Sequence, residues 1–133
     1  MTTPGPNLLL DTSVVIRPPS TGFPPGSHAL SVITVAELEY GVDATGDPLE
    51  RQRRRQRVGR LTSVFDVLPF DLAAAAAYGM VAGLVRAGGR NPRPRRLDLL
   101  IAATAVRHGL GLLTRNPDDF RHLERALPVV TVA

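Results

Sequence analysis

Four acidic residues are the part of this sequence best suited to chemistry: Asp11, Glu37, Asp98 and Asp119. Each is expected where a strand gives way to a helix, or in the first turn of a helix. In an open parallel α/β sheet these junctions meet along one edge, where such folds bind ligands. Carboxylates in one crevice repel one another unless a cation joins them, and oxygen ligands favour hard cations such as Mg²⁺ or Mn²⁺. The sequence therefore predicts a divalent metal site and chemistry on a phosphate.

The segments that must position these acids alternate between short apolar strands and helices. Strands are predicted over residues 7–10, 28–32, 64–68, 111–114 and 129–132. Helices are predicted over residues 34–42, 48–63, 72–88 and 97–108, with Asp47 and Asp71 as the N-caps of the second and third. A short helix is predicted within residues 116–126, and loops at 17–27 and 90–96. No hairpin turn signal separates the strands, which favours a parallel sheet with helices on both faces. We therefore expect a three-layer α/β/α domain over residues 1–133, with a central parallel sheet of four to five strands.

The predicted helix over residues 97–108 gives the strongest argument for a functional acid. Its apolar side chains cover nearly every direction around the axis, and a helix that is apolar all round is buried. Asp98 enters in the first turn, where a lone charge is costly unless it is paired, capped or bound to metal. The preceding loop carries Arg93, Arg95 and Arg96, whose guanidinium groups suit contacts with phosphate.

Helix capping offers an alternative role for several of the acids. Asp11 could accept backbone N–H groups in the turn after its strand. Glu37 follows Thr34 at the spacing of a capping box, with Thr34 as N-cap and Glu37 at N3. Asn116 is a good N-cap residue, and Asp119 would then also fall at N3. No single position decides between the two roles, whereas the joint placement of the acids at one edge of the sheet favours function.

Composition restricts the remaining possibilities. The net charge is +4 and all 16 basic residues are arginine, which fits either codon bias or a nucleic-acid partner. Six of the arginines lie between residues 51 and 60 on one predicted helix. They would form either a solvated helix face or a contact with RNA. The absence of cysteine excludes disulfides and thiolate metal sites. No apolar stretch is long enough to span a membrane, and the N-terminus is unlike a signal peptide, so we expect a cytoplasmic protein.

Four segments, in order along the chain, resemble those of a known family. They are LLLDTS at residues 8–13, SVITVAELEYG at 31–41, DLLIAATA at 98–105 and LTRNPDDF at 113–120. Each motif alone is weak, whereas four in order at this spacing are specific and cover essentially the whole chain. The sequence resembles the PIN-domain ribonucleases of the VapC toxin type.

The resemblance implies a role for each matching position. Four acids would form the catalytic centre, namely Asp11, Glu37, Asp98 and Asp119. Two of them would be the main metal ligands, namely Asp11 and Asp98. Three polar residues would support the acids, namely Thr12, Thr114 and Asn116. The position of Asn116 is acidic in some relatives. Four arginines would contact RNA, namely Arg93, Arg95, Arg96 and Arg115.

The resemblance also implies an activity and partners. The protein would be a Mg²⁺-dependent endoribonuclease, with Mn²⁺ able to substitute, and the toxin of a type II toxin–antitoxin system. Its substrate would be an RNA such as a tRNA or rRNA loop, cleaved to a 5′-phosphate and a 3′-hydroxyl. A VapB-like antitoxin would bind over the acidic pocket, and the toxin would form a homodimer and a hetero-oligomer with the antitoxin. No membrane partner is expected.

Three other classes compete with this interpretation. A receiver-type signalling domain is also a small doubly wound domain with an acidic Mg²⁺ pocket, but it needs a lysine, and this chain has none. A phosphatase with an aspartate nucleophile would require Asp-x-Asp after the first strand, where this chain has Asp11, Thr12 and Ser13. A catalytically inactive, RNA-binding PIN-like domain would keep the fold without the activity.

Overall fold

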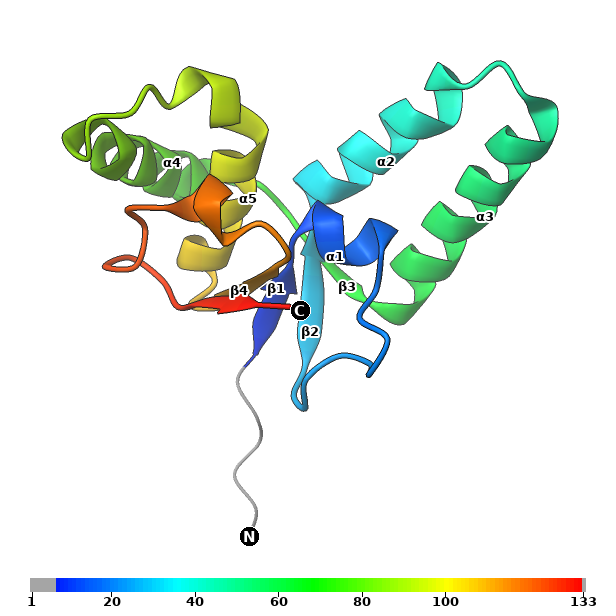
Figure 1. Cartoon of the computed structure of the whole chain (residues 1–133), viewed down its shortest axis with the longest axis horizontal. Helices are drawn as coiled ribbons and strands as arrows, with labels where there is room; N and C mark the ends of the chain where they lie inside the picture. The colour runs from blue at the N-terminus through cyan, green and yellow to red at the C-terminus, as the bar shows by residue number, and fades with distance from the viewer. Residues whose placement is uncertain (1–6, 133) are drawn as a thin grey trace, which may run out of the picture.

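Five parallel strands form the centre of the computed structural model, which describes residues 7–132 (Figure 1). The strands are β1 (Leu8–Leu10), β2 (His28–Ser31), β3 (Asp66–Leu68), β4 (Gly111–Thr114) and β5 (Val129–Thr131). The helices are α1 (Thr12–Ile16), α2 (Val32–Ala44), α3 (Pro48–Val64), α4 (Leu72–Ala87) and α5 (Arg96–Arg107). Two short 3₁₀ helices are η1 (Arg93–Arg95) and η2 (Pro117–Phe120). Within residues 7–132, no helix is long and apolar enough to cross a membrane.

The strand order is β3-β2-β1-β4-β5, and every neighbouring pair is parallel. The chain builds β2 and β3 on one side of β1 and then β4 and β5 on the other, so the winding reverses between β1 and β4. Open α/β sheets bind ligands outside the carboxyl ends of the strands at such a reversal. The order differs from the 2-1-3-4-5 order of receiver-type domains, so the receiver alternative is wrong.

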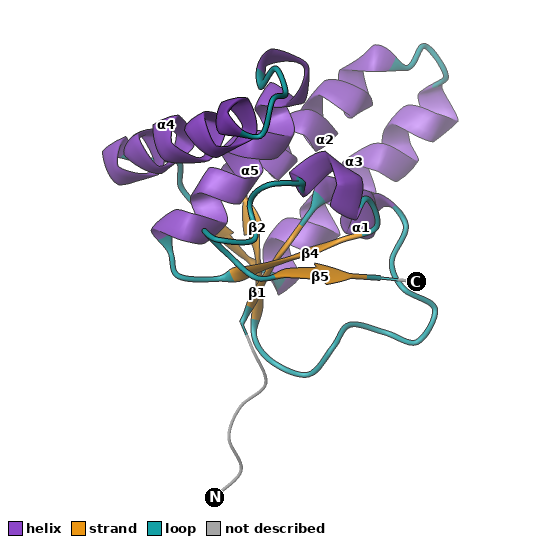
Figure 2. Ribbon diagram, turned by 60° about the vertical axis from the view of Figure 1, so that its left-hand side comes forward, coloured by secondary structure: helices purple, strands orange, loops and turns teal. Residues whose placement is uncertain are grey.

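Alternating side chains along the strands divide the core into two apolar clusters. Leu9 and Leu112 lie in the cluster that includes buried residues of α4 and α5. Leu10 and Leu113 lie in the other cluster, with buried residues of α1, α2 and α3. Because successive strand residues point to opposite faces, the two clusters cover the two sides of the sheet. The expected α/β/α arrangement with a parallel sheet is thereby confirmed. Figure 2 shows the orange strands below most of the purple helices.

Helix starts follow local capping chemistry. Asp47 caps α3 by accepting a hydrogen bond from the backbone N–H of Leu49 at 3.1 Å, with Pro48 in the first turn. Asp71 caps α4 by accepting from the backbone N–H of Ala74 at 2.9 Å. Both helix starts agree with the expectation from sequence.

Three segments differ from the expected elements. The turn expected after Asp11 is the short helix α1, whose Val14 and Val15 are buried against the sheet. The short helix expected within residues 116–126 is the four-residue 3₁₀ helix η2, which ends because Arg121 has a ψ of 144° and His122 a positive φ of 76°. Helix α5 is largely buried, but Leu97 in its first turn is 50% exposed, so burial all round is wrong at that end.

Candidate active site

Asp11 follows β1 directly, at the reversal point beside β4. Its carboxylate is buried and does not cap α1; instead Oδ2 accepts hydrogen bonds from the hydroxyls of Ser13 and Thr114, both at 2.8 Å. The backbone N–H of Asp11 donates to the carbonyl of Leu113 at 2.9 Å, which extends the pairing of β1 with β4. Two hydroxyl donors on one oxygen fix the orientation of the carboxylate at the carboxyl edge of the sheet.

Glu37 lies in the second turn of α2, not at the N3 position of a capping box. The helix starts earlier than expected, because the side chain of Ser31 accepts from the backbone N–H of Ile33 at 3.0 Å and acts as the N-cap. Thr34 is therefore inside the helix and buried, and the capping role expected for Thr34 and Glu37 is wrong. Glu37 is instead held by Thr12, whose hydroxyl donates to its Oε1 at 2.9 Å.

The pKa of Glu37 lies above its ordinary value for two reasons. Burial of the carboxyl group is the larger cause, and the nearby charge of Asp11 adds to it, while the hydrogen bond from Thr12 opposes both. A carboxyl group from α2 and one from the end of β1 thus lie within electrostatic reach of each other.

Asp98 lies in the first turn of α5, and its pKa is raised to about 7. Burial is the largest cause, followed by the charges of Asp11, Asp119 and Glu37, while Arg95 opposes the rise. No hydrogen-bond donor from the described part of the chain satisfies this carboxylate, so it does not serve as a helix cap. All four acids are therefore brought together, with Asp98 responding to the charge of the other three.

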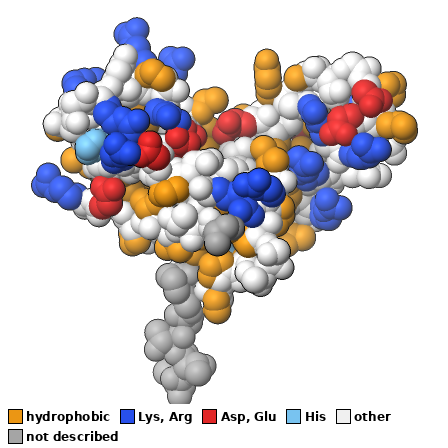
Figure 3. Space-filling model, viewed as in Figure 1, with side chains coloured by type: hydrophobic (Ala, Val, Ile, Leu, Met, Phe, Trp, Pro, Cys, Tyr) orange, Lys and Arg blue, Asp and Glu red, His pale blue; other side chains and the backbone are white. Residues whose placement is uncertain are grey.

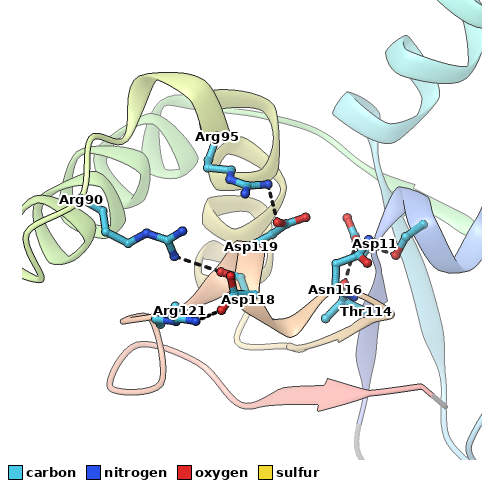
Figure 4. Close-up of polar contacts among 9 residues, drawn as sticks. Asp11, Arg90, Arg95, Thr114, Asn116, Asp118, Asp119 and Arg121 are labelled. Atoms are coloured by element: carbon cyan, nitrogen blue, oxygen red, sulfur yellow. Dashed lines mark hydrogen bonds and ion pairs between the residues drawn. The ribbon is translucent and has the colours of Figure 1, made fainter.

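Asp119 and Asp118 in η2 point to different partners, as Figure 4 shows. Asp119 forms an ion pair with Arg95. Asp118 forms an ion pair with Arg121, and its carbonyl accepts from Arg90 at 3.2 Å. Only Asp119 of the two contributes to the raised pKa of Asp98. Asp119 is therefore the acid of this pair that belongs to the cluster.

Asn116 does not cap η2 with its side chain, contrary to the expectation from sequence. Its backbone N–H donates to the Thr114 hydroxyl at 3.0 Å, and its carbonyl accepts from the backbone N–H of Asp119 at 3.0 Å. The buried Thr114 hydroxyl thus connects Asp11 to the start of η2. The Asn116 side chain is exposed beside the cluster.

The donor chemistry of the cluster fits a hard divalent cation. All four acids offer carboxylate oxygens, and the repulsion that raises the pKa of Asp98 is relieved by a cation. Across residues 7–132, no three acidic or histidine side chains lie close enough together to form a metal-binding group. Asp119 in particular is held by Arg95. Coordination by all four acids therefore requires side chains to turn toward a common point.

Arginines of the loop before α5 border the acids. Arg93, Arg95 and Arg96 line a pocket of about 350 Å³ together with Glu37 and Asp98. Figure 3 shows acidic side chains near the hollow between the two helical lobes and basic side chains on both lobes. Basic groups around an acidic floor suit a polyanion whose phosphate meets a cation held by the acids.

Arg115 approaches the cluster from the α1 side. Its backbone N–H donates to the Ser13 hydroxyl at 3.2 Å, and its Nε donates to the carbonyl of Arg17 at 2.7 Å. The guanidinium is thereby tied to the end of α1. Of the four arginines expected to contact RNA, this one lies apart from the pocket formed by the loop before α5.

Two hydroxyl residues that were not predicted as site residues complete the network. Ser13 Oγ donates to Asp11, and Thr34 Oγ1 lies 3.1 Å from Thr12 Oγ1. Both residues fall in the segments that carry the acids, so a hydroxyl within three residues of an acid was the available signal. Which way these two hydroxyls point depends on where α1 and α2 start, and the sequence alone did not show those starts.

The sequence is similar to proteins of one family. The PIN domain family model matches residues 25–126. The chain is 36% identical to Ribonuclease VapC4 of Mycobacterium tuberculosis over 115 residues, which cover 83% of this chain and 86% of the relative. It is 31% identical over 98 residues to a tRNA(fMet)-specific endonuclease VapC of Shigella flexneri, covering 74% of this chain and 70% of the relative.

Solved structures give the same result for the fold. A chain in the crystal structure of VapBC-5, a member of the VapBC family of toxin–antitoxin systems from Mycobacterium tuberculosis, superposes with a TM-score of 0.83 at 31% identity. The match covers 96% of this chain and 100% of that one. FitAcB from Neisseria gonorrhoeae gives a TM-score of 0.75 at 28% identity, covering 93% and 96% of the two chains.

Proposed function

The chain belongs to the PIN-domain family, and within it to the VapC ribonucleases, the toxins of type II toxin–antitoxin systems; on that premise we propose that it is a Mg²⁺-dependent endoribonuclease. The observation that carries the metal dependence is the pKa of Asp98, raised to about 7 by burial and by three neighbouring acids. Such an excess of negative charge at the carboxyl edge of the sheet is balanced by a divalent cation. Mn²⁺ is expected to substitute, since it accepts the same oxygen ligands.

Each acid has a role in this proposal. Asp11 and Asp98 hold the metal directly, Glu37 holds it directly or through water, and Asp119 is the fourth acid. When bound, Mg²⁺ would polarise the scissile phosphate and lower the pKa of the attacking water. The hydroxyls of Thr114 and Ser13 keep the Asp11 carboxylate oriented, because both donate to the same oxygen.

The supporting residues and arginines act on geometry and substrate binding. Thr12 orients Glu37 through its hydrogen bond of 2.9 Å, and Asn116 links Thr114 to η2 through its backbone. RNA is bound by four arginines, namely Arg93, Arg95, Arg96 and Arg115. We propose a tRNA as the substrate class, because one relative is named as a tRNA(fMet)-specific endonuclease. We propose a cytoplasmic location, which fits a substrate of this class.

The partner proposed for the toxin is a VapB-like antitoxin, in line with the VapBC complexes among the similar structures. An apolar pocket of about 490 Å³ lies beside the acids and is lined by Ile33, Ala36, Glu37, Tyr40 and Leu97. Tyr40 is 78% exposed and Leu97 is 50% exposed, so this surface is available to a partner segment. We further propose a homodimer of the toxin and a hetero-oligomer with the antitoxin, both of which light scattering of the purified toxin and of the co-expressed pair would test.

The activity is tested with purified protein and a tRNA in the presence of Mg²⁺. The wild type should cleave the tRNA, chelation with EDTA should stop cleavage, and Mn²⁺ should restore it. Asp98→Asn should lose at least about a hundredfold in rate, because it removes one of the main metal ligands. Equal rates for Asp98→Asn and wild type would identify a contaminating nuclease. Failure of the wild type to cleave with either metal would favour the inactive RNA-binding alternative.

A further inference from the structure

Helix α3 carries six arginines, and most of them have partners within the fold. Four are engaged with acidic side chains or with carbonyl oxygens of α2, α3 and the intervening loop, namely Arg51, Arg53, Arg54 and Arg55. These contacts join α3 to α2 and stabilise the helical hairpin. They leave two arginines of α3, Arg57 and Arg60, whose guanidinium groups make no hydrogen bond or ion pair within residues 7–132. Arg60 is exposed to solvent, whereas Arg57 is half-buried.

Arg57 lines a pocket of about 370 Å³ between α1, α2 and α3. The apolar wall includes Leu38 and Val58, which are both buried. The side chain of Arg57 is half-buried against this wall, but its guanidinium nitrogens are not among the buried atoms that lack a partner, so they stay accessible from solvent. The acidic side chain nearest in sequence, Glu50, is already paired with Arg53 and Arg54. The guanidinium of Arg57 thus has no acceptor within the described residues and is open to one supplied from outside the protein.

The position of this pocket relative to the acids indicates what that acceptor is. Glu37 lines the pocket of Arg57 and also the pocket formed by Arg93, Arg95 and Arg96. Glu37 therefore lies between a basic group on α3 and the basic loop before α5. A polyanion that crosses the acid cluster would meet positive charge on both sides of it.

We propose that Arg57 binds a backbone phosphate of the RNA substrate on the α3 side of the scissile bond. The loop arginines hold the backbone on the α5 side, so that the scissile phosphate lies over the acids. Arginine suits this role because its planar group donates two parallel hydrogen bonds to a phosphate. The proposal rests on the proposed function, with RNA as the substrate. It adds the path of the RNA strand across the site, between α3 and the loop before α5. Arg57 is thus a positioning residue rather than a catalytic one.

The test measures binding of a fluorescently labelled tRNA by anisotropy at several salt concentrations. The protein is the full chain with Asp98→Asn, which prevents cleavage during the titration. Adding Arg57→Gln should weaken binding about tenfold, the effect expected for a lost charge-assisted hydrogen bond. The slope of log affinity against log salt should become less steep by about 0.7, as for one lost phosphate contact on a single strand. Arg57→Lys should recover the slope but only part of the affinity.

Two variants on the same helix serve as matched controls. Arg60→Gln removes an exposed arginine that also has no partner but lies outside the pocket, and Arg55→Gln removes one that is paired with Glu39. Both should change the tRNA affinity less than about twofold. The melting temperature of Arg57→Gln should stay close to that of the parent, because the guanidinium makes no hydrogen bond or ion pair within residues 7–132 and glutamine keeps part of the aliphatic stem.

The outcomes separate this proposal from the proposed function. Equal losses for Arg57→Gln and Arg60→Gln would show a diffuse electrostatic effect and overturn the phosphate site. An unchanged salt slope with Arg57→Gln would also overturn it. So would an unchanged tRNA affinity together with weaker binding of an acidic antitoxin segment. In the Asp98-intact enzyme, Arg57→Gln should raise KM for tRNA about tenfold while kcat stays within about twofold. Absence of cleavage by the wild type would contradict the nuclease function and leave the binding result intact.

Discussion

Arg95 forms an ion pair with Asp119 at the rim of the acid cluster, so one of the four acids is held by a cation of the protein itself. The same arginine lowers the pKa of Asp98, against the effects of burial and of the other acids. Arg95 therefore partly compensates the charge of the metal-free cluster. It lines both the pocket with Arg93 and Arg96 and a second pocket of about 360 Å³ beside η2.

Replacing Arg95 with glutamine should strengthen metal binding. The change releases Asp119 and removes a positive charge that competes with the cation, so the Mn²⁺ affinity should rise roughly threefold to tenfold in a calorimetric titration. Arg121→Gln is the matched control, because Arg121 pairs with Asp118, which does not affect Asp98. Its Mn²⁺ affinity should stay within about twofold of the wild type. A weaker affinity in Arg95→Gln would mean that the ion pair assists the metal site.

Replacing Thr114 with valine should lower both stability and metal affinity. Valine keeps the shape but removes the hydroxyl that donates to Asp11 and accepts from the backbone N–H of Asn116. Asp11 Oδ2 then keeps only the hydrogen bond from Ser13, and the backbone N–H of Asn116 loses its acceptor, which should cost about 1 kcal/mol and lower Tm by roughly 4 °C. Mn²⁺ binding should weaken severalfold, because the Asp11 carboxylate loses its orientation.

Thr104→Val provides the control for that experiment. Thr104 is fully buried, lies 3.1 Å from the Ser31 hydroxyl and donates to the carbonyl of Leu100, without touching an acid. Its Tm should fall by a similar amount while the Mn²⁺ affinity is retained. Equal weakening of Mn²⁺ binding in the two variants would assign the effect to general loosening of the fold.

The stability of the metal-free protein should decrease as the pH rises through about 7. Asp98 ionises near 3.8 in the unfolded chain and near 7 in the fold, so the folded state holds the proton more tightly. The stabilisation from this proton is complete below the unfolded value and is lost as the pH passes the folded value. Since the group is partly exposed, the effect should be about 1 kcal/mol, or roughly 3 °C in Tm.

Asp98→Asn checks this pH dependence because it cannot ionise. In EDTA its Tm should match the wild type at acid pH and exceed it above the folded pKa. Asp43→Asn, at an exposed position of α2, should follow the wild type at every pH. An Asp98→Asn variant that is less stable than the wild type at alkaline pH would show that the ionised carboxylate is stabilised within the fold. Mg²⁺ should raise the wild-type Tm more strongly as the pH rises, because the ligand must lose its proton to bind.

Much of the fold could be predicted from residue patterns. The short apolar runs at Leu8–Leu10 and Gly111–Thr114 predict buried parallel strands, and Asp47 and Asp71 predict helix starts because their caps are local. The start of α2 was missed because two hydroxyl residues, Ser31 and Thr34, compete for the N-cap. The contact of Thr34 with Thr12, 22 residues away, belongs to the tertiary structure and leaves no local signal.

The acids themselves could be predicted, but their partners could not. Position at strand ends and helix starts is enough to bring Asp11 and Asp98 to one edge. The hydrogen bond from Thr114 to Asp11 spans 103 residues and depends on β1 lying beside β4. The pairing of Arg95 with Asp119 likewise depends on how η2 folds back toward α5. Arg57 could not be separated from its five arginine neighbours until their contacts were known.

Direct titration of Mn²⁺ into the metal-free protein above the folded pKa of Asp98 tests the central claim, that the four acids form one metal centre. The wild type should bind Mn²⁺, and Asp11→Asn and Asp98→Asn should each bind at least about tenfold more weakly, since even the loss of a group that orients a ligand costs about that much. The double variant should bind no Mn²⁺ at this site. Wild-type affinity in Asp98→Asn would contradict the account, because the acid most affected by its neighbours would then have no part in holding the metal.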